Sequence, residues 1–100
     1  LSEPEMRQVL IRLAAASSAK LLADRGIQYE LSAPVIHRLV RLAGKDAALG
    51  ARPLRHLLTR EVEGFLADGI LRGKIRAGHR VRVSLERGQM RLDLIPQTRP

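Results

Sequence analysis

Apolar residues recur at helical spacing over the first quarter of the chain. Ser2-Glu3-Pro4-Glu5 has the form of a capping box, in which the side chains of Ser2 and Glu5 each accept a backbone N–H of the other. Basic residues largely fill the positions between the apolar ones, which are Met6, Val9, Leu10, Leu13 and Leu21. The pattern predicts one long helix. Gly26 ends it, because glycine readily adopts the left-handed conformation of a helix C-terminus.

A short strand and a second helix follow. Residues 27–31 alternate between apolar and polar side chains, as a half-buried strand does. Ser32 then caps a helix that has Pro34 in its first turn and ends near Gly44. The buried face of this helix is expected to comprise Val35, Ile36, Leu39 and Val40.

The second half of the chain predicts a third helix and a hairpin. After a connector at residues 45–49, the helix runs from Arg52 to about Arg72, and Gly64 favours a bend or break inside it. Residues 81–85 and 90–94 alternate around a turn at residues 86–89. The sequence therefore predicts a single α+β domain over residues 1–100, with three main helices packed on a small three-stranded sheet.

Composition excludes several classes of protein. The chain has 100 residues, 45% of them hydrophobic, with one Phe, one Tyr and no Cys. A disulfide framework is impossible, and the three scattered histidines do not predict a metal site. No segment has the length of a membrane span and no signal peptide is evident, so we expect a cytoplasmic protein. Because the chain begins at Leu1, beside a helix cap, we expect it to be a piece of a longer polypeptide.

The net charge of +8 indicates an acidic partner. Nucleic acid is one candidate, with the basic residues of the hairpin following the phosphates: Arg80, Arg82, Arg87 and Arg91. Against this, Tyr29 is the sole aromatic residue near the expected sheet, and no reading helix is recognisable. A free-standing basic domain that binds nucleic acid or another protein stays open as the alternative.

Gly50-Ala51-Arg52-Pro53-Leu54-Arg55 is the best candidate for a binding segment. Gly50 frees the backbone, and the proline suits a first helical turn. A helix start offers N–H donors and partial positive charge, and Arg52 adds a planar cationic fork suited to phosphate. Arg55 lies one turn further, either facing the same cleft or pairing in solvent with Glu63 or a neighbour's acid. Ala51 either lets another surface approach closely or is a permissive linker residue.

No enzyme motif accompanies this segment. The chain has no phosphate loop, no apolar strand ending in paired acids and no nucleophile elbow. We therefore expect no catalytic residue, and no firm nucleotide binding by the chain alone.

The order of these motifs resembles the C-terminal small domain of the Clp family of AAA+ unfoldases and disaggregases, of the ClpA, ClpB and ClpC type. The Gly-Ala-Arg run at residues 50–52 resembles the family's sensor-2 motif at the start of its third helix. The flanks that carry the resemblance are residues 21–27, 31–33, 59–63 with 66–67, 70–75, 77–78 and 81–83. The match covers nearly the whole chain.

The resemblance implies a lid over a nucleotide. Arg52 would be the sensor-2 arginine that reaches the γ-phosphate side of ATP or ADP, with Gly50, Ala51 and Arg55 beside it. Magnesium would be held by the large domain that precedes the lid in the family. The implied partners are that large domain, neighbouring subunits of a homo-hexameric ring, protein substrates and, in some subfamilies, a peptidase ring. Any ATP hydrolysis would belong to the parent chain.

Two departures from the family pattern leave the subfamily open. The family's Gly-Tyr-Asp-Pro-x-Tyr run is replaced by residues 44–49, which lack both aromatics and the proline. An Asn-Pro pair common in the third helix is replaced by Gly64-Phe65.

Overall fold

Two segments that lie far apart in the sequence pair to form the sheet. The computed structural model describes residues 2–44 and 50–96. Strand β1 (Gln28–Leu31) runs parallel to β2 (Arg80–Glu86), and β2 pairs antiparallel with β3 (Gln89–Leu94). The strand order is β1-β2-β3. The small three-stranded sheet expected from the sequence is confirmed.

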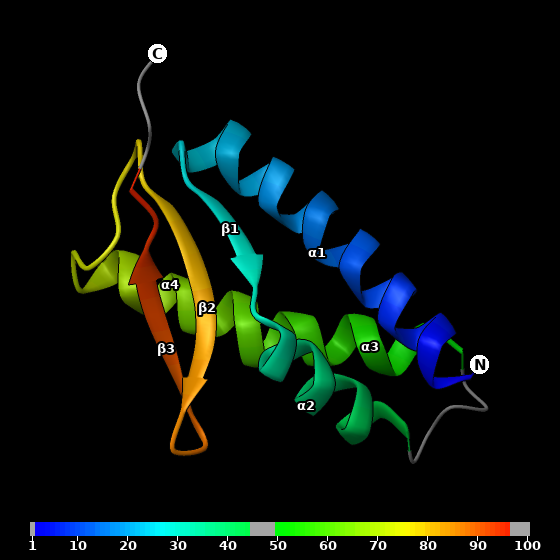
Figure 1. Cartoon of the computed structure of the whole chain (residues 1–100). Coiled ribbons are helices and arrows are strands. Elements are labelled where there is room, and N and C mark those ends of the chain that lie inside the picture. Colours follow the sequence, from blue (N-terminus) through cyan, green and yellow to red (C-terminus); the bar gives the residue numbers. More distant parts are fainter. Residues whose placement is uncertain (1, 45–49, 97–100) are drawn as a thin grey trace.

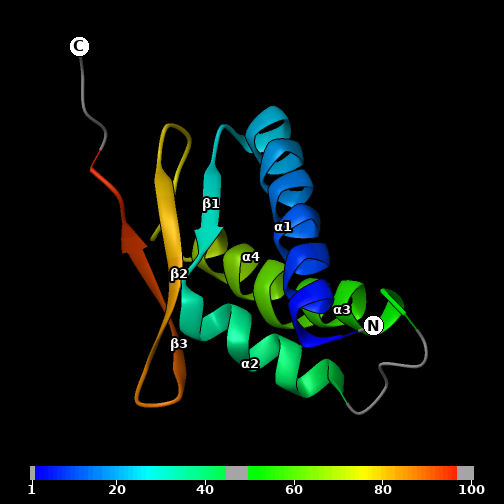
Figure 2. The same cartoon turned by 45° about the vertical axis from the view of Figure 1, so that its right-hand side comes forward.

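The helices gather on one face of this sheet (Figures 1 and 2). They are α1 (Glu3–Arg25), α2 (Ala33–Ala43) and a long third helix in three parts: α3 (Arg52–Leu57), η2 (Leu58–Glu63) and α4 (Gly64–Leu71). The arrangement is the predicted α+β fold. The predicted connector at residues 45–49 lies outside the described residues.

The ends of the helices follow the capping residues. The Glu5 N–H donates to Ser2 Oγ (3.3 Å), and the Ser2 N–H donates to Glu5 Oε1 (2.9 Å). Gly26 ends α1 with φ +73°. The Val35 N–H donates to Ser32 Oγ (3.4 Å) at the start of α2. All three predicted caps are confirmed.

The third helix changes its hydrogen-bond pattern near Gly64, where a bend or break was predicted. Segment η2 is π-helical, and the Gly64 N–H donates to the carbonyl of Thr59, five residues earlier. The chain therefore continues as a helix through this point, with one locally wider turn. The third helix ends at Leu71, one residue before the predicted end.

The core lies between the sheet and the helices. Its fully buried side chains come from every layer: Leu10, Ile27, Val35, Leu39, Val40, Leu54, Val62, Ile75, Val81 and Val83. Helix α4 approaches β3 closely at Gly69, where an added Cβ would lie 2.8 Å from Leu92 Cδ1. A larger residue at position 69 would therefore require the end of the Leu92 side chain to shift.

The β2–β3 turn holds a strained residue. Arg87 and Gly88 both have positive φ, of 53° and 78°, as a two-residue type I′ turn requires. Glycine adopts this conformation freely, whereas a long side chain is strained there.

We predict that Arg87→Asn raises the free energy of unfolding by about 1 kcal/mol, because asparagine tolerates positive φ. Urea unfolding monitored by circular dichroism measures the change. Gly88→Ala is the matched control. No atom outside its neighbouring residues lies within 4 Å of the added Cβ, so the loss of stability expected there reports backbone strain alone. An unchanged or lower stability of Arg87→Asn contradicts the assignment of strain to this turn.

Candidate functional site

The third helix begins without a side-chain cap. Gly50 has φ +72°, and Ala51 precedes the helix in a right-handed conformation with no side-chain hydrogen bond to the helix start. Arg52 is the first helical residue and Pro53 the second, and the Arg55 N–H donates to the Ala51 carbonyl (3.0 Å). The helix start thus offers N–H donors that no side chain of the described residues caps, together with the positive end of the helix dipole.

Both arginines of this helix start face solvent. Arg52 and Arg55 are exposed, and neither forms an ion pair with any described residue. On the opposite side of the helix, Leu54 is fully buried and Leu57 nearly so, which fixes the rotation of the helix about its axis. The structure therefore holds the backbone of this segment in place, and its two guanidinium groups have no acidic partner within residues 2–44 and 50–96.

The segment is suited to an anion. Residues 50–60 contain three arginines and one histidine and no acidic residue. Two guanidinium groups three positions apart on one helix are neighbours, and planar guanidinium groups bind phosphate with two hydrogen bonds. The residues present therefore fit a phosphate group, and none of them fits Mg²⁺, which prefers oxygen ligands.

One alternative for Arg55 is wrong. The sequence left open a solvated pair between Arg55 and Glu63, but Glu63 Oε2 accepts a hydrogen bond from Ser17 Oγ (2.5 Å) and forms no ion pair with Arg55. Glu63 is the last residue of the π-helical segment, and its carboxylate faces Ser17 of α1. A common cleft with Arg52 and a pair with an acid of a neighbouring subunit are the alternatives that stay open.

The arginines of the strands, in contrast, form ion pairs within the chain. Arg80 and Arg82 both contact Glu30, at 3.2 and 3.1 Å. Arg91 pairs with Glu86 and with Asp93, and the hydrogen bond from Ser84 to Asp93 (2.7 Å) lowers the pKa of Asp93, as does Arg91. These pairs are solvent-exposed and contribute little stability, but they offset part of the positive charge that would attract a nucleic-acid backbone. The nucleic-acid alternative is not favoured.

A polar cluster between α1, β1 and η2 was not predicted from the sequence. The Tyr29 N–H donates to Ser18 Oγ (2.9 Å), which joins β1 to α1 in the interior. The Tyr29 hydroxyl, near Ser17 and Glu63, is buried without a hydrogen-bond partner among the described residues. The signal was present, because Ser18 continues the four-residue spacing of the buried positions Met6, Leu10 and Ala14. The cluster ties elements together and holds no arrangement of nucleophile and base.

A metal-binding cluster and a membrane-spanning helix would each bear on the function, and the described residues contain neither. Within residues 2–44 and 50–96, no three His, Asp or Glu side chains lie close enough to hold a metal ion. In the same residues, no helix combines the length and hydropathy that crossing a bilayer requires.

Comparison with known proteins identifies the family. The model of the C-terminal, D2-small domain of ClpB protein matches residues 1–83. The chaperone protein ClpB of Aquifex aeolicus is 42% identical over 80 residues, which is 80% of this chain and 8% of that protein. ClpB of Helicobacter hepaticus is 40% identical over 74 residues (74% and 8%), and ClpB of Rickettsia typhi 33% over 86 residues (86% and 10%). The chain thus spans a tenth or less of the length of these relatives.

We predict an alkaline loss of stability that depends on Tyr29. Burial, with a smaller contribution from the Glu63 carboxylate, raises the pKa of Tyr29 from 10.0 to about 12. Below the pKa of the unfolded state, both states keep the phenolic proton. As the pH rises from 10 to 12, the unfolded chain loses the proton first, so stability falls by on the order of 2 kcal/mol.

Tyr29→Phe is the control, because it keeps the ring and removes the titrating group. Urea unfolding at about pH 9 and about pH 12 compares the two proteins, so the titration of other groups cancels. The loss should be smaller in the variant by the stated amount. Because Tyr29 is the only tyrosine, the tyrosinate absorbance gives an independent check, and a midpoint near pH 10 in the folded chain contradicts this account.

Proposed function

The chain belongs to the family of C-terminal D2-small domains of ClpB, and from this premise we propose that it is the nucleotide-sensing lid of a Clp-type, ATP-dependent protein unfoldase or chaperone. In this proposal, residues 1–100 are one C-terminal domain of a longer chain whose large domain holds ATP or ADP with Mg²⁺. The observation that carries the proposal is Arg52: an exposed guanidinium without an ion pair in the described residues, on a helix start that lacks a side-chain cap.

Arg52 acts through the charge and shape of its side chain. ATP supplies a terminal phosphate with several acceptor oxygens, and Arg52 donates two parallel hydrogen bonds to it. The uncapped N-terminus of the third helix adds a favourable field, and Arg55 contributes a second positive charge on the same face. When the phosphate leaves after hydrolysis, Arg52 loses its partner, and the preference of the lid for the closed arrangement weakens.

The lid would transmit this change as a rigid body. Leu54, Leu57 and Leu58 lock the third helix into the core, so a pull on Arg52 moves the whole domain. Rotation of the lid against its own large domain is then a hinge motion coupled to the nucleotide state. In a homo-hexameric ring, such motions act on neighbouring subunits and on the protein substrate. A peptidase ring is a further partner in peptidase-linked members.

We predict that Arg52→Ala in the parent protein lowers ATP-dependent protein remodelling by about tenfold to a hundredfold, the value of one charge-assisted phosphate contact. Arg52→Lys keeps the charge but not the planar fork and should recover only part of the activity. Steady-state ATP hydrolysis and substrate unfolding are measured on the same preparations.

Arg12→Ala is the matched control, because Arg12 is also exposed and forms no ion pair with a described residue. It should leave both activities unchanged. All three variants should unfold thermally within a few degrees of the unaltered protein, as exposed substitutions do. Coupled activity of Arg52→Ala equal to that of the unaltered protein refutes the sensing role.

A second prediction concerns the 100-residue chain alone. It contains no phosphate loop and no paired acids to hold Mg²⁺ or orient water, so it should not hydrolyse ATP. A phosphate-release assay on highly purified chain checks this. Turnover that co-purifies with the chain and disappears in Arg52→Ala would place catalysis within this domain. It would contradict the proposal that hydrolysis requires the large domain of the parent protein.

A further inference from the structure

Strand β3 is an open edge of the sheet. It pairs with β2 on one side, and its other side has no strand partner among the described residues. The two-residue turn makes Glu86 and Gln89 a hydrogen-bonded pair, and such pairs alternate along an antiparallel ladder. The Ile95 N–H donates to the Arg80 carbonyl (2.8 Å), which agrees with this alternation.

The backbone groups that point away from β2 therefore belong to the residues in between: Met90, Leu92 and Leu94. These are also the residues whose side chains face the helices. A partner strand at this edge would thus bond directly to the backbone of the apolar positions.

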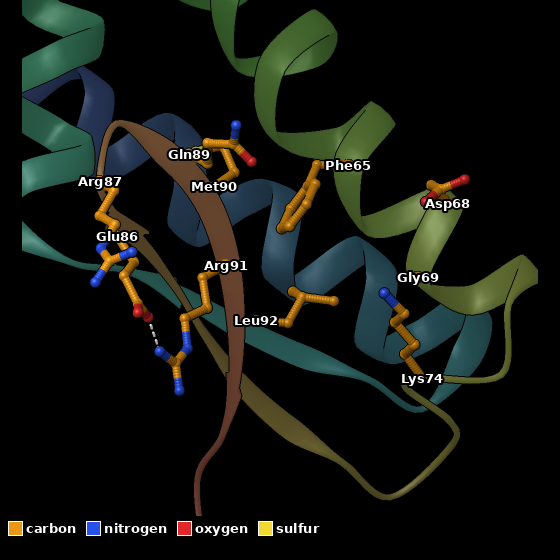
Figure 3. A pocket seen from close by; sticks show the side chains of 10 residues that line it. All are labelled: Phe65, Asp68, Gly69, Lys74, Glu86, Arg87, Gln89, Met90, Arg91 and Leu92. Atoms are coloured by element: carbon orange, nitrogen blue, oxygen red, sulfur yellow. Dashed lines mark ion pairs between the residues drawn. The ribbon is translucent and has the colours of Figure 1, made fainter.

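The apolar side of the edge is not fully covered. Met90 and Leu92 are half-buried, and with Phe65 they line a groove of about 530 Å³ between α4 and β3 (Figure 3). Leu94 is 55% exposed. Figure 3 shows Arg91 and Glu86 on the other side of the strand, joined by an ion pair. The strand thus has an apolar face and a charged face, and its backbone edge is open.

The sequence of β3 is complementary to itself. When a second copy runs antiparallel with Leu92 at the centre, Leu92 faces Leu92 of the second copy, and Met90 faces its Leu94. Arg91 then lies opposite Asp93 of the second copy, and the twofold axis repeats this pair. Opposite charges directly across an antiparallel pair are favourable, whereas like charges are not.

Neighbouring registers lack this match. Residues whose backbone groups point outward must face each other across the pairing, so the twofold axis passes through a residue and not between two residues. The centre can therefore move from Leu92 to Arg91 or to Asp93. Those registers place Arg91 against Arg91, or Asp93 against Asp93. The Leu92-centred register is therefore the one that charge selects.

We propose that β3 pairs edge to edge with β3 of a second copy of this chain, in the antiparallel register centred on Leu92, to form a continuous six-stranded sheet. The contact is twofold and closes after two copies, unlike the cyclic contacts of a ring. It is independent of nucleotide and of Arg52. Its test can therefore fail while the lid function holds, and the reverse.

The first test is the concentration dependence of the mass of the 100-residue chain in sedimentation equilibrium. The unaltered chain should form a dimer and no larger species. Leu94→Pro removes an outward N–H that the β2–β3 ladder does not use, and two such bonds are lost per dimer. The dimer dissociation constant should rise about tenfold or more.

A second pair of variants keeps the test decisive if the proline disturbs the hairpin. Leu94→Lys places a charge at the edge and should also weaken the dimer. Leu42→Lys, at a leucine of α2 with 45% exposure, should not. Circular dichroism confirms that each variant is folded.

The register is tested with Leu92→Cys, because the chain has no native cysteine. Two facing cysteines at the twofold axis are within disulfide reach, so mild oxidation should give a covalent dimer, whereas Leu42→Cys should not. A chain that stays monomeric at its highest soluble concentration overturns the proposal. So does a dimer that Leu94→Pro and Leu94→Lys leave as strong as the unaltered one.

Discussion

The parallel pairing of β1 with β2 is the contact on which the rest of the fold depends. It brings the end of the first helix against a strand that follows the third, and every helix in between must lie on one face of the sheet. Ser32 shows how tightly the elements are joined. Its N–H donates to the Val83 carbonyl (2.9 Å), which extends the ladder, and its hydroxyl caps α2. Strand β1 thus ends where helix α2 begins.

This framework decides which arginines are available for binding. The sheet places Glu30 beside Arg80 and Arg82, so these charges are satisfied within the chain. The third helix is held by Leu54 in the core, and its first turn carries Arg52, which is exposed and forms no ion pair with an acid of the described residues. The positive charges of the chain therefore differ in how available they are to an acidic partner. The guanidinium groups at the start of α3, which have no ion pair among the described residues, lie side by side on a helix start that the core holds in place, and phosphate recognition requires such an arrangement.

Local sequence signals predicted the helices and strands, but they could not predict contacts between residues far apart in the sequence. The caps at Ser2, Gly26 and Ser32 depend on residues within a few positions, so the helix ends could be predicted from sequence. The π-helical form of the irregularity before Gly64 could not, because it depends on how the helix packs on both sides. The Arg52 segment was predicted from its motif, but only the positions of the acids within residues 2–44 and 50–96 show that none of these acids pairs with it. The Ser17–Glu63 bond, between residues 46 apart, was missed for the same reason.

The central claim is that Arg52 binds the terminal phosphate of ATP and loses this contact after hydrolysis. The most direct test is an experimental structure of the assembled parent protein in two states, with a non-hydrolysable ATP analogue and with ADP. The account predicts that the guanidinium nitrogens of Arg52 lie about 2.7–2.9 Å from terminal phosphate oxygens with the analogue, and lose that contact with ADP. An Arg52 side chain that points to solvent, or that pairs with a protein carboxylate in both states, would contradict it.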